Sequence, residues 1–213
     1  MPTACRLSQT LKVMNITTAA RSDLDEAVDC LATAFAHDPI TGFLLQTGSG
    51  YRERVTQFFS LLMRARMALN VPVLVARDIA GIHGAAMGYT TESPAWPTDI
   101  ADEWDRFEKA IPGMTDRMAV YGAITATGEP AAPHYYLGVI GVEPDSHGLG
   151  IGTQLLKSFC DLSASDPLSS GVYMETAKAL NVGFYEHAGF VETGRGSLGA
   201  ATLWCMFLPH GSR

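Results

Sequence analysis

Hydrophobic residues recur every three or four positions in several stretches of the chain, with polar residues between them. Over residues 23–36 this spacing predicts an amphipathic helix. We expect a capping box of Ser22 and Asp25 at its start and the sequence His37-Asp38-Pro39 at its end. Similar patterns predict further helices over residues 51–70, 99–110, 114–125, 151–163 and 181–187.

Short runs of β-branched and other apolar residues predict the strands. We expect them at residues 11–17, 71–76, 82–91, 135–142, 171–175, 190–192 and 201–207. The second and third should form an antiparallel hairpin, and so should the last two. The strand at 135–142 reaches the strand at 171–175 through a helix, so these two should pair in parallel. The sequence thus predicts an α/β fold of the α+β type, with a mixed, mostly antiparallel central sheet flanked by helices.

The turn between the strand at 135–142 and the next helix carries three glycines, Gly148, Gly150 and Gly152. The first amides of a helix have no partner within the helix, and the helix dipole adds partial positive charge at the same end. Glycine also leaves room for a phosphate group to approach the backbone. The segment therefore predicts a site for a phosphorylated ligand.

Two common phosphate-binding motifs do not fit the spacing of these glycines. A dinucleotide-binding fingerprint that began at Gly150 would need a third glycine at position 155, where the chain has Leu155. A P-loop needs a lysine before its serine or threonine, but Thr153 follows Gly152 directly. A glycine-rich helix entry that binds no ligand is the plain alternative.

The sequence VEPDSHGLGIG, residues 142–152, resembles the acetyl-CoA signature of the GCN5-related N-acetyltransferase (GNAT) superfamily. About forty residues later, NVGFYEHAGF at 181–190 resembles the second motif of the same superfamily, Asn-x-x-Phe-Tyr-x-x-x-Gly-Phe. The match is strong over residues 135–192 and weaker over the N-terminal half. Three further segments, at 88–93, 173–176 and 204–206, are similar to puromycin N-acetyltransferase-like members.

The resemblance implies a single GNAT domain over residues 1–213, with a splayed parallel strand pair at the CoA site. Residues 11–133 would shape the acceptor site, and residues 134–208 would bind acetyl-CoA. Backbone groups of Ile140, Gly141 and Val142 would hold the pantetheine arm. The pyrophosphate would be held by the turn and the helix start, namely His147, Gly148, Leu149, Gly150, Ile151, Gly152 and Thr153.

Three side chains of these motifs have individual expectations. His147 stands where the superfamily usually has arginine or glutamine; it can still donate to a pyrophosphate oxygen, but its charge depends on pH. Asn181 would either hydrogen-bond the CoA arm or cap the helix that contains it. Phe184 would lie against the bound CoA.

The chemistry requires an acid for the departing thiolate and help in deprotonating the amine. Tyr185 is the candidate general acid, with a structural tyrosine of the helix as its alternative. Glu175, at the end of a strand, is the candidate for attracting the amine or relaying its proton; a merely solvated glutamate is its alternative. At pH 7 an α-amine of pKa near 7.8 is about 14% neutral, against about 0.04% for a lysine-like amine, so an α-amine acceptor demands less of a base.

The resemblance favours acetyl transfer from acetyl-CoA to the amine of a small molecule, by direct attack within a ternary complex. A protein or peptide N-acetyltransferase of the same fold is an alternative, and it would need an open groove. A CoA-binding sensor module without turnover is another. The acceptor site should come from residues 37–45 and 93–130, where Trp96, Trp104 and Tyr121 either line it or pack in the core. The sequence His37-Asp38-Pro39 either faces this site or only ends the first helix.

Composition narrows the remaining possibilities. The 213 residues carry a net charge of −7, which argues against nucleic acid as the main partner. The cysteines, at positions 5, 30, 160 and 205, show no CxxC spacing and indicate reduced thiols. The cysteines and histidines together show no metal-ligand spacing, so we expect no metal. Neither a membrane span nor a signal-peptide pattern is present, so we expect a cytoplasmic protein; the oligomeric state stays open.

Overall fold

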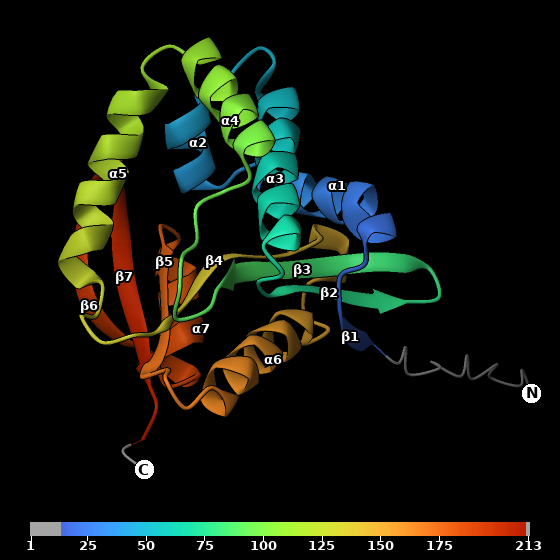
Figure 1. Ribbon diagram of the computed structural model, residues 1–213, viewed down its shortest axis with the longest axis vertical. Coiled ribbons are helices and arrows are strands. Elements are labelled where there is room, and N and C mark those ends of the chain that lie inside the picture. The colour runs from blue at the N-terminus through green and yellow to red at the C-terminus, as the bar shows by residue number, and fades with distance from the viewer. Residues whose placement is uncertain (1–13, 212–213) are drawn as a thin grey trace, which may run out of the picture.

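A mixed seven-stranded sheet forms the centre of the protein in a computed structural model that describes residues 14–211 (Figure 1). The strands lie in the order β1-β2-β3-β4-β5-β7-β6. Their bounds are β1 Asn15–Thr18, β2 Val73–Asp78, β3 Gly81–Tyr89, β4 Tyr135–Val142, β5 Gly171–Thr176, β6 Val191–Leu198 and β7 Ala201–Pro209. The predicted α/β class with a mostly antiparallel sheet is confirmed.

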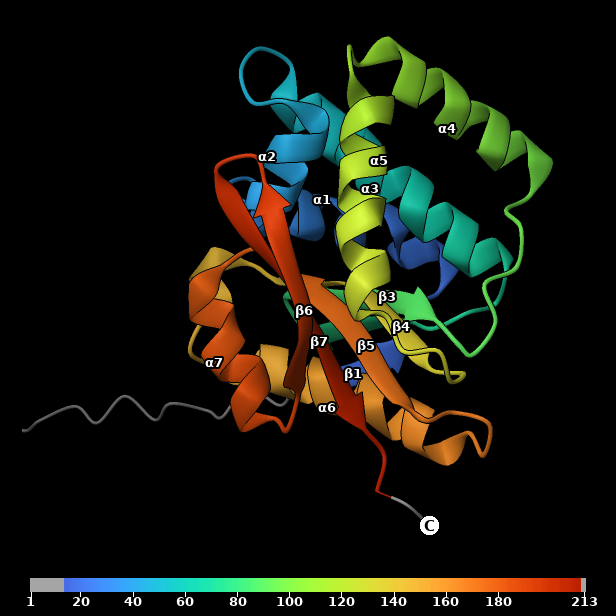
Figure 2. The same cartoon turned by 90° about the vertical axis from the view of Figure 1, so that its left-hand side faces the viewer.

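Helices cover both faces of this sheet. They are α1 Leu24–Ala34, α2 Pro39–Leu45, α3 Tyr51–Ala68, α4 Thr98–Ala110, α5 Met114–Gly128, α6 Ile151–Ser165 and α7 Ala179–His187. Short 3₁₀ turns lie at Arg21–Asp23 and Pro144–Ser146. Figure 1 shows α1 and α3 on one face with α6 on the other, and Figure 2 shows α5 running alongside the hairpin of β6 and β7.

The strands β4 and β5 form the expected parallel pair, but only at one end. Tyr135 pairs with Val172 and Tyr136 pairs with Tyr173, and no later residue of β4 pairs with β5. Beyond this point β5 continues against β7, while β4 continues against β3. The two strands therefore splay apart in the middle of the sheet, and backbone groups on one side of β4 are left without a strand partner.

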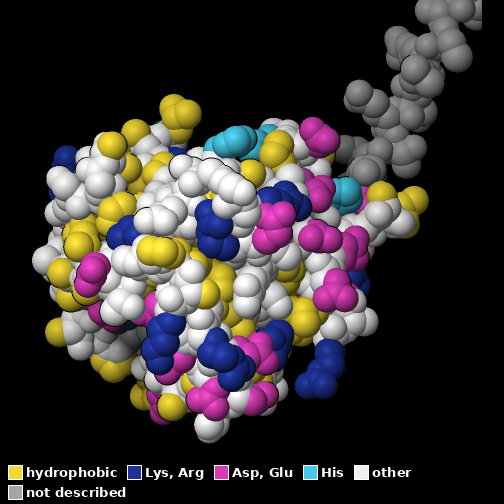
Figure 3. All heavy atoms as spheres, turned by 90° about the horizontal axis from the view of Figure 1, so that it is seen from above, with side chains coloured by type: hydrophobic (Ala, Val, Ile, Leu, Met, Phe, Trp, Pro, Cys, Tyr) yellow, Lys and Arg dark blue, Asp and Glu magenta, His cyan; other side chains and the backbone are white. Residues whose placement is uncertain are grey.

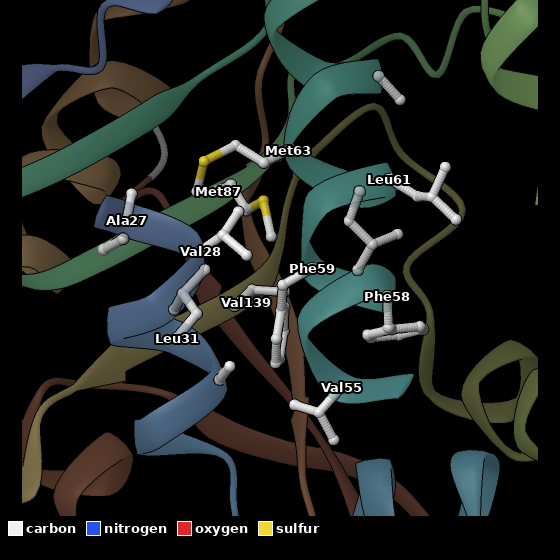
Figure 4. Packing of buried hydrophobic residues seen from close by; sticks show 14 of the residues in the cluster. Ala27, Val28, Leu31, Val55, Phe58, Phe59, Leu61, Met63, Met87 and Val139 are labelled. Atoms are coloured by element: carbon white, nitrogen blue, oxygen red, sulfur yellow. The ribbon is translucent and has the colours of Figure 1, made fainter. Parts of the chain in front are cut away.

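Apolar side chains fill the space between α1, α3 and the sheet. Figure 4 shows Leu31 of α1 facing Phe59 of α3, with Met87 of β3 and Val139 of β4 beneath them. Phe59 is fully buried, and its ring lies 4.9 Å from that of Phe35. Truncating such a phenylalanine typically costs about 3–5 kcal/mol, so this layer fixes the helices above the splayed strands.

A second apolar cluster lies on the opposite face, beneath α6. Its fully buried members include Leu155 and Phe159 of α6, which pack against Val172 and Met174 of β5. Tyr185 and Phe190 extend this cluster towards α7. The alternation of β5 residues explains the division, since Val172 and Met174 face α6 and Tyr173 and Glu175 face the other side.

Three expectations about the elements need correction. The capping box of Ser22 and Asp25 is wrong: the carboxylate of Asp23 accepts a 2.8 Å hydrogen bond from the Ala20 amide instead. Asp38 and Pro39 do more than follow the first helix; they begin α2, with Asp38 accepting bonds from the amides of Ile40 and Thr41 at 2.9 and 3.1 Å. An aspartate cap followed by proline is typical of a helix start.

The last expected hairpin is longer than its apolar pattern. The pattern predicts a strand only over residues 190–192, but β6 continues to Leu198 and pairs with β7 along its whole length. The first strand is found at Asn15–Thr18, and residues 11–13 of the expected strand lie outside the described residues.

Candidate active site

The glycine-rich turn opens α6 with two residues in left-handed conformation. Gly148 has φ +79° and Gly150 has φ +74°, and a side chain at either would project into open space. Within residues 14–211, the amides from Gly148 to Thr153 make no hydrogen bond to another residue outside the helix ladder. This cluster of amides at a helix N-terminus can accept an anion such as a pyrophosphate.

The side chains around this turn serve mainly to anchor it. Ile151 is fully buried beneath the sheet, whereas Leu149, Gly152 and Thr153 lie at or near the surface. Ile151 can therefore offer only its backbone to a ligand. The exposed ring of His147 donates to the Val142 carbonyl, with Nε2 2.9 Å from that oxygen. A carbonyl can only accept, so Nε2 carries the proton, and Nδ1 can donate to a phosphate only in the protonated imidazolium.

The strand before the turn offers its backbone to the splay. Ile140 and Val142 pack their side chains against the α6 cluster, while Gly141 is buried under α1. A Cβ at Gly141 would lie 2.7 Å from the Phe35 ring, so glycine allows α1 to pack directly on β4. All three residues pair with β3 on one side only. Their groups on the other side can bind the amides and carbonyls of an extended ligand arm.

Helix α7 lies beside the splay and carries the second motif. It begins at Ala179 with Lys178 at the cap position, so Asn181 sits inside the first turn and does not cap the helix. Among the described residues the Asn181 side chain has no hydrogen-bond partner, which leaves its amide free for a ligand. Phe184 is 37% exposed on the same helix.

Tyr185 points into the protein, with 4% of its surface exposed. Its ring lies 5.1 Å from that of Phe184 and 5.7 Å from that of Phe190. Burial raises the pKa of Tyr185 above its usual range, and the nearby carboxylate of Asp38 raises it further. The phenol therefore keeps its proton at neutral pH and can donate it.

A cavity of about 450 Å³ lies on the α1–α5 side of the sheet. Eight of its twenty lining residues are aromatic, namely Phe35, Phe58, Phe59, Tyr89, Trp96, Trp104, Tyr121 and Tyr136. The ring of Trp104 lies 5.4 Å from Trp96 and 5.7 Å from Phe58, and the Trp96 indole donates to the Tyr89 hydroxyl at 2.6 Å. Trp96, Trp104 and Tyr121 thus pack together and line the cavity at the same time.

Glu175 forms part of the cavity wall and faces two phenols. Tyr136 and Tyr121 donate to its Oε2 at 3.0 and 3.1 Å. Burial raises the pKa of Glu175 to about 7, and the hydrogen bonds from Tyr136, Tyr121 and Tyr173 oppose this rise only in part. Burial, and next the charge of Glu175, raise the pKa of Tyr121 and of Tyr136 far above its ordinary value, so both remain donors.

The structure brings the predicted residues together around the splay, but on two sides. Glu175 and the cavity lie on the face of α1 to α5. Tyr185 and the glycine-rich turn lie on the α6–α7 face. A group that enters between β4 and β5 can meet both faces there.

Sequence reasoning missed one polar residue of the cavity, Arg66, and left Asp38 open between the acceptor site and a helix end. Arg66 reads as one of several arginines near the end of a helix, and Asp38 reads as part of a helix stop. Both are buried in the structure. An arginine on the apolar side of a helix is the signal that a helical projection of residues 51–68 would have given.

The surface and the remaining polar groups add little to this site. Figure 3 shows acidic and basic side chains interspersed over the face seen from above.

No cluster of three or more His, Cys, Asp or Glu side chains that could hold a metal ion occurs in residues 14–211. In the same part of the chain, no helix is both long and apolar enough to cross a membrane. Cys30, Cys160 and Cys205 are free thiols, and Cys5 lies outside the described residues.

Two comparisons with known proteins bear on the site and on the fold. Residues 114–192, which contain β4, the glycine-rich turn and α7, match the family model of the acetyltransferase (GNAT) domain. The fold resembles the histone acetyltransferase HPA2 and related acetyltransferase from Corynebacterium glutamicum, with a TM-score of 0.70 and 22% identity over 94% of this chain and 98% of that chain.

Two further solved structures share the fold. The protein yncA from Salmonella typhimurium, solved with its cofactor acetyl-CoA, has a TM-score of 0.55 and 18% identity over 92% of this chain and 93% of that chain. The ribosomal-protein-S18-alanine N-acetyltransferase from Escherichia coli has a TM-score of 0.54 and 16% identity over 92% and 94%. Residues 114–192 therefore match an acetyltransferase (GNAT) domain, and the chain has the fold of these solved acetyltransferases.

Proposed function

We propose that the protein acetylates the amine of a small molecule held in the aromatic cavity, by direct attack within a ternary complex. The observation that carries the proposal is the position of Glu175, whose carboxylate faces the cavity at the splay. The cavity volume of about 450 Å³ is in the range of small-molecule sites. Such a site suits a compact amine better than a protein segment, which needs an open groove.

The division of the chain follows from this arrangement. Residues 11–133 supply most of the cavity wall, through α1 to α5 and β3. Residues 134–208 supply the amides of the glycine-rich turn, the backbone of Ile140 to Val142, and Asn181 and Phe184 of α7 for acetyl-CoA. When bound, acetyl-CoA supplies the activated acetyl group.

Two residues would move the protons. The Glu175 carboxylate takes a proton from the ammonium form of the acceptor, which leaves a neutral nitrogen able to attack. The neutral nitrogen attacks the thioester carbon, the carbon–sulfur bond breaks, and the Tyr185 hydroxyl gives its proton to the sulfur that leaves. The proton that the new amide nitrogen then loses restores the Tyr185 hydroxyl, and Glu175 releases its own proton to solvent. A Tyr185→Phe variant loses the acid, so its kcat should fall at least tenfold while the Kd of acetyl-CoA stays unchanged. The variant should fold normally, because the Tyr185 hydroxyl has no hydrogen-bond partner among residues 14–211 whose loss would destabilise the fold.

Release of free CoA thiol tests the proposal directly. Small amines, with α-amino compounds prominent among them, and peptides with free N-termini are offered with acetyl-CoA. We expect release with small amines and none above background with peptides. Release with peptides alone would favour the protein acetyltransferase alternative, and acetyl-CoA binding without release on any amine would indicate a sensor.

A further inference from the structure

Arg66 lies inside the protein without a carboxylate partner. The residue is 4% exposed, and its guanidinium makes one hydrogen bond, from Nη1 to the Leu62 carbonyl of its own helix at 3.1 Å. Its buried Nε has no partner. Within the described part of the chain, no acidic side chain forms an ion pair with it. Buried arginines are ordinarily paired, because an unpaired charge away from water is costly.

Neighbouring groups compensate this charge only weakly. The guanidinium stacks over the Tyr89 ring, with its central carbon 4.6 Å from the ring centroid. A cation–π contact of this kind compensates a buried charge less well than a bidentate carboxylate pair does. Of the three carboxylates in the cavity wall, Glu175 accepts from two tyrosines and Asp38 accepts from two amides of α2. The third, the exposed Asp105, forms no ion pair with Arg66.

The unpaired donors face the cavity at the splay. Arg66 lines the same cavity as Glu175. Its Nη2 lies against β4, where a Cβ at Gly138 would come within 3.2 Å of it and within 2.9 Å of the Tyr136 ring. Tyr136 in turn donates to Glu175. The cavity therefore presents a cation and a carboxylate on either side of one tyrosine, surrounded by aromatic rings.

We propose that Arg66 binds a carboxylate of the acceptor, and that the acceptor is an amino acid with an apolar or aromatic side chain. This inference rests on the proposed function and adds the class of substrate to it. The ligand's carboxylate would complete the hydrogen bonds of the guanidinium, and its amine would face Glu175. Its side chain would lie against the wall formed by Trp96, Trp104 and Phe58. An α-amino acid carries its amine and carboxylate on one carbon, which suits two neighbouring polar groups in an otherwise apolar cavity.

Binding and turnover of matched acids and amides test this inference. For turnover, phenylalanine and leucine are compared with phenylalaninamide and leucinamide. The acids should have kcat/KM values at least tenfold higher, since a charge-assisted hydrogen bond is replaced by a weaker neutral one. The amino group of an amino-acid amide is less basic than that of the free amino acid, so a larger fraction of it is neutral at a given pH. This difference alone would favour turnover of the amide.

For binding, calorimetry on the CoA-loaded protein compares 3-phenylpropanoate with 3-phenylpropanamide, which have no amine to acetylate. We expect the acid to bind at least tenfold more tightly. The Arg66→Gln variant should lose this preference, whereas Arg64→Gln should keep it. Arg64 lies two residues away on the same helix and pairs with Glu103 at 2.6 Å, away from the cavity wall.

The outcomes separate this inference from the proposed function. Turnover of amides as fast as of acids, or equal binding of the acid and the amide, would overturn the role of Arg66 and leave small-molecule acetylation intact. Tight binding of the acid through Arg66 without any CoA release would support the carboxylate site and overturn the proposed function. The comparison in the wild-type protein decides the question even where Arg66→Gln fails to fold.

Discussion

At the scale of single residues, the environment of Glu175 decides what its carboxyl group can do. Burial favours the neutral acid, while the phenols of Tyr136 and Tyr121 favour the carboxylate at 3.0 and 3.1 Å. Burial is the larger effect, and the pKa of Glu175 rises to about 7. A base of this pKa can accept a proton from an amine and release it again near neutral pH, which an exposed glutamate with a pKa near 4.3 does much less well.

This predicts the pH dependence of catalysis. In the wild-type protein, kcat/KM should rise with pH up to about 7 and rise less steeply above it, because the ionised form of Glu175 is the active one. Glu175→Gln should lower kcat/KM by roughly a hundredfold or more and remove this limb of the profile. Rates of CoA release from pH 5.5 to 9 measure both effects.

The amine of the acceptor also titrates in this range. The Glu175→Gln variant shows the contribution of the amine alone to the pH dependence of kcat/KM. The other groups that face Glu175 are the phenols of Tyr121, Tyr136 and Tyr173, which stay protonated in this range. A Glu175→Gln profile with the same shape as that of the wild-type protein would mean that the acceptor, not Glu175, sets the pH dependence.

The roles of single residues were only partly predictable from the sequence. Glu175 could be named because it ends a strand just before the second motif, but its two phenols come from α5 and β4 and meet it only in the folded protein. For Arg66 the sequence offers only its place on the apolar side of a helix, because its contacts with β3 and β4 depend on packing. Local patterns carry little information about such contacts between distant segments.

At the scale of elements, local signals succeeded where one segment carried them in full. The strand β4, the glycine-rich turn and α6 follow each other within about thirty residues, and each was expected within two residues of its observed bounds. Strand β6 was mostly missed because its glycines and polar residues give no apolar alternation. Tertiary packing overrides that pattern: a Cβ at Gly196 would lie 2.8 Å from Ile124, so α5 packs closely on this strand.

The glycine-rich turn allows a controlled test at this scale. Gly150 and Gly113 each precede a helix in left-handed conformation, with φ +74° and +69°. Alanine at either position should cost about 1–2 kcal/mol of folding free energy, because an L-residue is strained there. Only Gly150→Ala should also weaken acetyl-CoA binding, since its methyl group would project from the turn towards the phosphates.

Urea unfolding and the Kd of acetyl-CoA measure these two effects separately. Gly113→Ala serves as the control for strain without loss of the anion site, because it begins α5 on the other side of the sheet. Equal Kd values for both variants would place the phosphates away from this turn.

At the scale of the whole molecule, the proposed function requires the sheet to separate the two substrates and the splay to bring them together. The acceptor cavity lies under α1 to α5, and the glycine-rich turn and α7 lie on the other face. The reacting groups can meet only where β4 and β5 part, after Tyr136 and Tyr173. If β4 and β5 paired over more residues, the unpaired backbone of β4 would be hydrogen-bonded to β5 and the gap between the two strands would close. The proposed site therefore requires the short parallel pairing.

The same arrangement places an acidic group in the interior, and this should affect the stability of the whole protein. The pKa of Glu175 is about 7 when folded and near its ordinary value of 4.5 when unfolded. Between these values the folded protein binds more protons, so the free energy of unfolding falls as pH rises from about 4.5 to 7 and the effect of this group then levels off. Asp38, whose pKa burial also raises, acts in the same direction, and Asp23, whose pKa is lowered, acts in the opposite one.

Glu175→Gln isolates the contribution of one carboxyl group, because its amide stays neutral at every pH. The variant should gain stability relative to the wild-type protein as pH rises, by up to roughly 3 kcal/mol at pH 8 compared with pH 4.5. Urea unfolding at steps of pH gives this difference, with Glu53→Gln on the exposed side of α3 as the control for loss of a surface carboxylate. A difference that does not change with pH would mean that Glu175 ionises as it does in water, and a base tuned by burial would then be excluded.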